Sequence, residues 1–220
     1  MKVLDSKIQE NSVTMPVGAR RLAGDLRTPV GATGMVIFAH GSGSSRFSPR
    51  NQSVARNLQE HGLGTLLFDL LTEAEERQDS YTAHLRFDIS LLAERLIAVT
   101  NWISQHETTH DLPLGYFGSS TGAAAALVAA AMDHRARAIV SRGGRPDLAG
   151  EDLGHVRAPV LLIVGENDGE VIELNERARE KLKCKNSISV IPRATHLFEE
   201  PGALEEVSRL AAEFFAQHLK

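Results

Sequence analysis

The stretch GSSTG, residues 118–122, joins a short apolar segment to an alanine-rich one, and this junction decides the fold. Residues 113–117 (PLGYF) predict a short buried strand, and residues 123–132 (AAAALVAAAM) have high helix propensity. A sharp strand-to-helix turn needs small residues two positions before and after its centre, and the two glycines meet that need. The turn therefore holds Ser120 in strained backbone and projects its hydroxyl outward, where it can act as a nucleophile.

Two further polar turns follow predicted strands later in the chain. Residues 159–164 (PVLLIV) form an unbroken apolar run, typical of a strand buried on both faces of a parallel sheet, and lead into a turn that holds Asp168. Residues 187–191 (SISVI) predict the final strand, and His196 follows it. Loops at the carboxyl ends of parallel strands share one edge of the sheet. We therefore expect Ser120, Asp168 and His196 to meet there as nucleophile, acid and base.

Strand and helix patterns alternate from residue 35 to residue 219, which predicts an α/β fold with a mostly parallel sheet and helices on both faces. One or two exposed strands over residues 3–27 are expected to form an antiparallel edge. The chain has no repeat and no linker, so we expect residues 1–220 to be a single domain. The predicted core strands are 35–39, 65–69, 113–117, 138–141, 160–164 and 188–191, and the predicted helices are 49–61, 87–105, 121–132, 171–182 and 202–218.

Four motifs carry a resemblance to a known family: residues 40–46 (HGSGSSR), the GSSTG turn, the turn Gly165-x-x-Asp168 and residues 194–198 (ATHLF). Through them the chain resembles, almost end to end, an α/β-hydrolase of the dienelactone hydrolase-like group. The resemblance implies the α/β-hydrolase fold and hydrolysis of an ester-like bond through an acyl-enzyme, with no cofactor and no metal. Dienelactone hydrolases proper use a cysteine nucleophile, whereas this chain has Ser120 at that position.

The segment between Gly144 and Pro159 is short. Many α/β-hydrolases carry a lid at this place, and so few residues leave little room for one. The resemblance therefore implies little or no lid and an open site, which suits small soluble substrates. Similar domains are fused to phosphoribosyltransferases in other proteins, and we expect no such second domain within these 220 residues.

Ester hydrolysis passes through a tetrahedral intermediate whose oxyanion needs two preorganised donors. We expect the first from the backbone N–H of Thr121, at the N-terminus of the helix that follows the nucleophile. We expect the second from the Ser42 N–H, in a glycine-rich loop whose backbone can approach the substrate closely. His40 begins this loop and is expected to orient it.

Three arginines fall at the same predicted edge of the sheet and offer a clue to the substrate. Arg46 lies in the glycine-rich loop, and Arg142 and Arg145 directly follow a core strand. A guanidinium fork binds carboxylate or phosphate in a bidentate manner, so these residues favour an anionic ester or lactone. Alternatively, they pair with an acidic loop, residues 73–76, or with Asp147 and join loops to one another.

Two further interpretations concern the identity of the catalytic acid and a possible zinc motif. Asp168 can be a simple turn former, in which case Glu166 is the catalytic acid. Residues 106–110 (HETTH) match the HExxH pattern of zinc metalloproteases. They end a predicted helix and precede a strand, so they should lie at the edge of the sheet opposite Ser120, and we expect no metal there.

The function classes left open share one scaffold. The same triad serves carboxylic esters, lactones, thioesters and acyl transfer, so a thioesterase or acyltransferase is an alternative. A non-catalytic ligand-binding protein with the same fold is another.

A formal net charge of −4 argues against nucleic acid as a partner. The single cysteine, the absence of a signal peptide and the absence of any stretch long enough to span a bilayer favour a soluble cytoplasmic protein. The oligomeric state is open.

Overall fold

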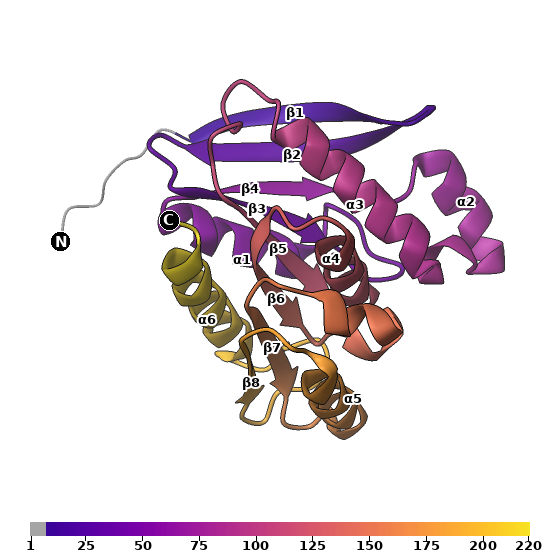
Figure 1. The fold of residues 1–220 in the computed structure, drawn as a ribbon, viewed down its shortest axis with the longest axis vertical. Coiled ribbons are helices and arrows are strands. Elements are labelled where there is room, and N and C mark those ends of the chain that lie inside the picture. Colours follow the sequence, from indigo (N-terminus) through magenta and orange to yellow (C-terminus); the bar gives the residue numbers. More distant parts are fainter. Residues whose placement is uncertain (1–7) are drawn as a thin grey trace.

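An eight-stranded sheet in the order β1-β2-β4-β3-β5-β6-β7-β8 runs through the computed structural model, which describes residues 8–220 (Figure 1). β1 pairs antiparallel with β2, and β2 pairs antiparallel with β4, whereas the other neighbours are parallel. The predicted mostly parallel α/β architecture is thus confirmed. The strands are β1 (Ile8–Val17), β2 (Arg20–Pro29), β3 (Gly34–Ala39), β4 (Leu63–Phe68), β5 (Leu114–Ser119), β6 (Ala136–Arg142), β7 (Val160–Gly165) and β8 (Asn186–Ile191).

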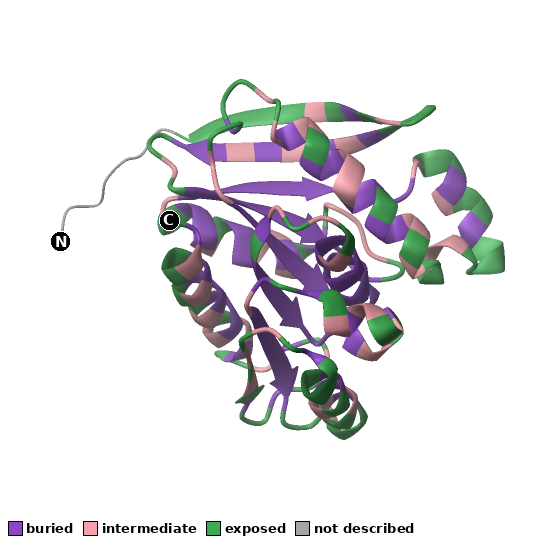
Figure 2. Ribbon diagram, in the orientation of Figure 1, coloured by how far each residue is buried: buried purple, intermediate pink, exposed green. Residues whose placement is uncertain are grey.

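Helices cover both faces of this sheet (Figure 1). α1 (Pro49–Glu60) and α6 (Ala203–His218) pack on one face, and α3 (Ile89–Ile103), α4 (Thr121–Met132) and α5 (Gly169–Lys181) pack on the other. Because both faces are covered, the central strands are buried along their length and consist of near-continuous apolar runs (Figure 2). Among the described residues, none of the helices combines the length and the apolarity needed to cross a bilayer.

The N-terminal hairpin is less exposed than the sequence indicated. Leu22 and Leu26 of β2 are fully buried in the core, so only β1 forms an exposed edge. The predicted antiparallel edge is present, and one of its two strands is exposed. β2 is covered because its alternate side chains point inward, beneath the layer that contains α3. Residues 3–7 of the predicted edge lie outside the described residues.

Residues 73–76, expected in a loop, begin the helix α2 (Glu73–Thr82). Thr72 and Glu75 form a reciprocal capping box at its N-terminus. Glu75 also reaches Arg95 of α3, which donates to both carboxylate oxygens at 2.6 and 2.9 Å and to the Leu70 carbonyl at 2.5 Å. This buried network joins α2, α3 and the loop after β4.

Two short 3₁₀ segments complete the chain: η1 (Leu85–Phe87) and η2 (Pro146–His155). η2 occupies the connection between β6 and β7, and its Ala149 and Leu153 are buried in the same core as α4 and α5. The connection therefore packs down onto the helices beside it as it returns from the carboxyl end of β6 to the amino end of β7.

Candidate active site

The GSSTG stretch forms the sharp turn between β5 and α4. Ser120 has φ 51° and ψ −123°, a strained backbone conformation for a residue with a side chain. A Cβ at Gly122 would collide with the carbonyl oxygens of Ala39 and His40, and a Cβ at Gly118 would collide with the backbone of α4. Both glycines are therefore required by close backbone approach, for the reason the sequence indicated.

Hydrogen bonds fix the turn from two sides. The Ser120 N–H donates to the Arg142 carbonyl at 3.3 Å, and the Ser120 carbonyl accepts from the Arg145 N–H at 3.1 Å. The neighbouring Ser119 hydroxyl donates to Asn51 Oδ1 of α1 at 3.2 Å. The turn is thus attached to β6 and to α1, and the half-buried Ser120 side chain is left at the carboxyl edge of the sheet.

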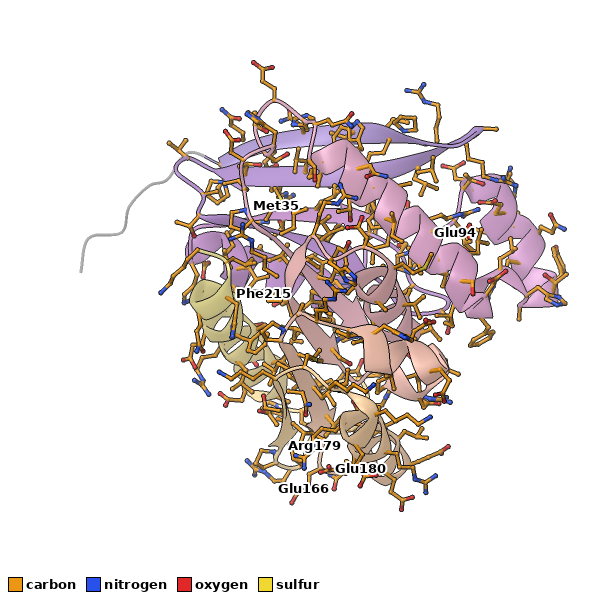
Figure 3. All side chains as sticks on the ribbon, in the orientation of Figure 1. Met35, Glu94, Glu166, Arg179, Glu180 and Phe215 are labelled. Carbon is orange, nitrogen blue, oxygen red and sulfur yellow. The ribbon has the colours of Figure 1, made fainter. Side chains whose placement is uncertain are left out.

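Asp168 and His196 come together from the ends of β7 and β8. His196 Nδ1 donates to Asp168 Oδ2 at 2.6 Å, a short charge-assisted hydrogen bond. Glu166, the alternative acid, instead accepts the Arg193 N–H at 2.6 Å and lies at the outer end of this region of the sheet (Figure 3). The Asn167 N–H also donates to the Ala194 carbonyl at 2.9 Å, so the two loops are joined beside the pair.

The His196 loop reaches the serine turn through Gly143. A Cβ built at Gly143 would lie 3.5 Å from His196 Cε1, and Gly143 directly follows the residue that accepts the Ser120 N–H. Within residues 8–220 the Ser120 hydroxyl makes no hydrogen bond. Nucleophile–base contacts are commonly long in unliganded sites and tighten in the reacting complex.

The glycine-rich loop after β3 is held by His40. His40 Nε2 accepts the Leu70 N–H at 3.0 Å, so Nδ1 carries the proton and donates to the Gly41 carbonyl at 2.9 Å. Burial lowers the pKa of His40, which keeps the ring neutral. His40 therefore orients the loop, as expected.

The two predicted oxyanion residues lie against each other. The Ser42 N–H donates to Thr121 Oγ1 at 2.9 Å across the site. The Thr121 N–H, at the first turn of α4, has no acceptor in the described part of the chain. The sequence indicated both backbone donors, but not the threonine hydroxyl that receives one of them.

Arg46 and Arg145 are both engaged by carboxylates. Arg46 pairs with Asp69 through its side chain and donates its backbone N–H to the same carboxylate at 2.8 Å, with Asp25 at 3.5 Å. Arg145 binds both oxygens of Asp147 at 2.8 Å. Arg145 thus pairs with Asp147, as the alternative interpretation expected, whereas Arg46 pairs with Asp69 and Asp25 instead of with residues 73–76.

Arg142 differs from the other two. Its side chain is buried, with the residue 8% exposed, and its Nε and Nη1 atoms have no hydrogen-bond partner within residues 8–220. The Phe198 ring lies 5.9 Å from its guanidinium carbon. Burial, with a further contribution from nearby Arg50, lowers the pKa of Arg142 to about 10, so the group is still charged at neutral pH. Arg142 is thus a buried cation at the end of β6, next to the residues that hold Ser120.

Residues 106–110 form turns between α3 and β5, at the amino end of that strand. The His106 ring packs at a tilt against Trp102 with ring centroids 4.7 Å apart, and His110 contacts Asp111 at 3.0 Å. The HETTH residues therefore lie at the opposite edge of the sheet from Ser120 and do not form the helix that HExxH zinc sites use.

Comparison with known proteins agrees with this fold. Residues 32–213 match the alpha/beta hydrolase domain family. The crystal structure of a dienelactone hydrolase from Anabaena variabilis is 56% identical, with a TM-score of 0.95, over 97% of this chain and 99% of that one. Est1E from Butyrivibrio proteoclasticus shares the fold at 18% identity and a TM-score of 0.77, over 94% of this chain and 98% of that one.

A protein of Mycobacterium tuberculosis, provisionally named a phosphoribosyl transferase, is 54% identical over 217 residues. The match covers 98% of this chain and 48% of that protein, so the chain spans about half the length of this curated relative. The family match and the Anabaena structure both concern the region that carries the serine turn and the Asp168–His196 pair. The chain therefore belongs to the α/β-hydrolase family, among its dienelactone hydrolase-like members.

Proposed function

We propose that the chain hydrolyses small carboxylic esters or lactones through an acyl-enzyme formed on Ser120. The observation that carries this proposal is the meeting, at one edge of the sheet, of a strained serine turn and an Asp168–His196 pair 2.6 Å apart. A carboxylate that orients a histidine toward a serine is the arrangement that activates a hydroxyl for acyl transfer.

In this mechanism the Ser120 oxygen attacks the ester carbonyl while His196 Nε2 takes the hydroxyl proton. Asp168 holds the imidazole with Nδ1 protonated and stabilises the imidazolium that forms. Collapse of the tetrahedral intermediate breaks the C–O bond, and His196 returns the proton to the departing alcohol. Water then attacks the acyl-enzyme while His196 takes its proton. The second tetrahedral intermediate collapses as His196 returns that proton to the Ser120 oxygen, which releases the acid and restores the serine.

Arg142 supports the expectation of an anionic ester or lactone as substrate. Of the three arginines considered, it is the one without a carboxylate partner in the described chain, and a buried guanidinium with two unused nitrogens can bind a carboxylate or phosphate oxygen. Arg46 and Arg145 are already neutralised by their own partners. The proposed substrate thus places its negative group toward the end of β6.

A fluorophosphonate probe tests the proposal, because it reacts only with an activated serine. We expect one label per chain by intact mass, on the peptide that contains Ser120, and no label in the Ser120→Ala variant. Ester hydrolysis should fall at least about 1,000-fold in that variant. Ser119→Ala is the matched control, since Ser119 binds Asn51 and should remain dispensable for labelling.

Absence of label on a well-folded protein would contradict the proposal and favour the ligand-binding alternative. If the label is present, a panel of oxygen esters, lactones and thioesters with matched acyl groups separates ester hydrolysis from thioesterase activity. Product analysis with added alcohol separates hydrolysis from acyl transfer.

A further inference from the structure

The Ser42 N–H raises a difficulty for an oxyanion hole built from two backbone donors. This N–H carries a single hydrogen, and it points at Thr121 Oγ1, 2.9 Å away. Ser42 and Thr121 are 79 positions apart in the sequence, so the contact ties the glycine-rich loop to the serine turn. One of the two expected donors is therefore used inside the protein.

The Thr121 hydroxyl, in contrast, has a hydrogen that is still available to donate. A hydroxyl accepts hydrogen bonds and also donates one. Thr121 Oγ1 accepts from Ser42, but its own hydrogen has no acceptor within residues 8–220. The residue is buried, at 3% exposed, and an unused donor in such a place ordinarily has a ligand or water as its partner.

Thr121 directly follows the nucleophile in the chain, and its hydroxyl is joined to the glycine-rich loop that contacts Ser120. A Cβ at Gly41 would lie 3.0 Å from Ser120 Cβ and 3.7 Å from Ser120 Oγ, so Gly41 lies directly against the serine. The N–H of the next residue, Ser42, donates to Thr121 Oγ1. Thr121, Gly41 and Ser42 also line a common cavity of about 10 Å³, close to the space that one water molecule needs.

We propose that the Thr121 hydroxyl is itself an oxyanion donor, and that the Ser42 N–H acts through it. This inference rests on the proposed serine-hydrolase function. Thr121 would supply two donors, its N–H and its O–H, to the oxygen that becomes negative when Ser120 attacks. A hydroxyl that accepts a hydrogen bond is polarised and becomes a stronger donor, so Ser42 strengthens the Thr121 bond without touching the substrate.

The competing arrangement makes the opposite prediction for one substitution. In the competing arrangement the Ser42 N–H is the oxyanion donor, and the Thr121 hydroxyl accepts its hydrogen bond only while the site is empty. Removal of the hydroxyl should then free the Ser42 N–H to bind the oxyanion. The Thr121→Val variant keeps the shape of the side chain and removes the hydroxyl. Under the proposal it is slow; under the competing arrangement it is as fast as the wild type or faster.

The experiment measures two rates on the wild type, Thr121→Ser, Thr121→Val and Thr121→Ala. One is the second-order rate of Ser120 labelling by a fluorophosphonate, whose phosphoryl oxygen occupies the oxyanion position. The other is kcat and KM for an oxygen ester that the wild type cleaves. Thr121→Ala provides the same information as Thr121→Val if the valine variant folds poorly, and circular dichroism with Tm confirms the fold of each.

We expect Thr121→Val and Thr121→Ala to lose about 100-fold in labelling rate and in kcat, with KM within about threefold, since loss of one oxyanion donor has that size of effect. Thr121→Ser should keep activity within about fivefold, because it retains the hydroxyl. Equal or faster labelling of the valine and alanine variants would overturn the inference and leave the serine-hydrolase proposal intact. An unlabelled wild type would overturn both.

Discussion

Two arginines are buried on opposite faces of the sheet, and they differ in what surrounds them. Arg95 of α3 is 3% exposed, and its guanidinium donates to both oxygens of Glu75 and to the Leu70 carbonyl. Arg142 at the end of β6 is 8% exposed, with two nitrogens that have no partner in the described chain. Both guanidinium groups are largely removed from water. Arg95 has hydrogen bonds to protein groups in place of those to water, whereas Nε and Nη1 of Arg142 have none in the described chain.

This difference separates a structural charge from one that is available for binding. A buried ion pair is destabilised strongly when one partner is removed, because the other charge is left without compensation. A buried cation without a partner is already uncompensated, so its removal should affect the fold little and affect a bound anion more. We therefore expect the two sites to respond to substitution in opposite ways.

The largest expected effect is on the stability of the paired site. Glu75→Gln removes the charge opposite Arg95 and should lower the free energy of unfolding by about 3 kcal/mol or more, measured by urea denaturation. Glu73→Gln, on the same helix but with an exposed side chain, is the matched control and should change it by less than about 0.5 kcal/mol. Equal losses in the two variants would show that Arg95 does not depend on its partner.

Acid should weaken the same pair. Burial raises the pKa of Glu75, but hydrogen bonds from Arg95 and Thr72 outweigh it and hold the folded pKa at about 2, against an ordinary value of 4.5. Because the folded pKa is the lower one, the pair contributes fully above about pH 4.5 and loses its contribution as pH falls toward about 2. The difference in Tm between wild type and Glu75→Gln should therefore narrow over this range. A difference that stays constant down to pH 2 would contradict the assignment.

The unpaired site should respond mainly in substrate binding. Arg142→Met removes the buried charge and keeps an apolar chain of similar length. We expect a change of less than about 1 kcal/mol in stability, and a rise in KM of about tenfold or more for anionic esters alone, the size of one charged hydrogen bond. Arg145→Met is the control, because its charge is already paired with Asp147, and should leave the preference for anionic over neutral esters unchanged. Equal effects of Arg142→Met on neutral and anionic esters would remove the case for an anionic substrate.

Much of the fold could be predicted from the sequence because the parallel strands are buried on both faces. Unbroken apolar runs such as residues 160–164 and 35–39 predict strands of a parallel sheet covered on both faces, and both runs lie in strands. The turn that holds Ser120 was predictable for a related reason, since close backbone approach at Gly118 and Gly122 excludes any side chain. The chain order of strands then placed Asp168 and His196 at the same edge, where they form a hydrogen bond.

What could not be predicted depends on contacts between distant segments. The acidic start of α2 gives a polar, loop-like pattern, and only the Thr72–Glu75 capping box marked it locally as a helix. The partners of Arg46 are Asp69 and Asp25, which follow or belong to two other strands, and no local pattern joins them. Likewise, the contact between Ser42 and the Thr121 side chain exists only because the loop after β3 folds over the start of α4.

The strained backbone at Ser120 also has a meaning for molecular evolution. A positive φ at a residue with a side chain lowers the stability of the fold, whereas glycine adopts the same conformation without steric strain. A lineage released from selection on its chemistry could therefore relieve that strain by a single change from serine to glycine, at the cost of its nucleophile. The serine at this position thus lowers the stability of the fold and supplies the nucleophile. Without selection on the reaction, we expect mutations to remove the hydroxyl before they disrupt the fold.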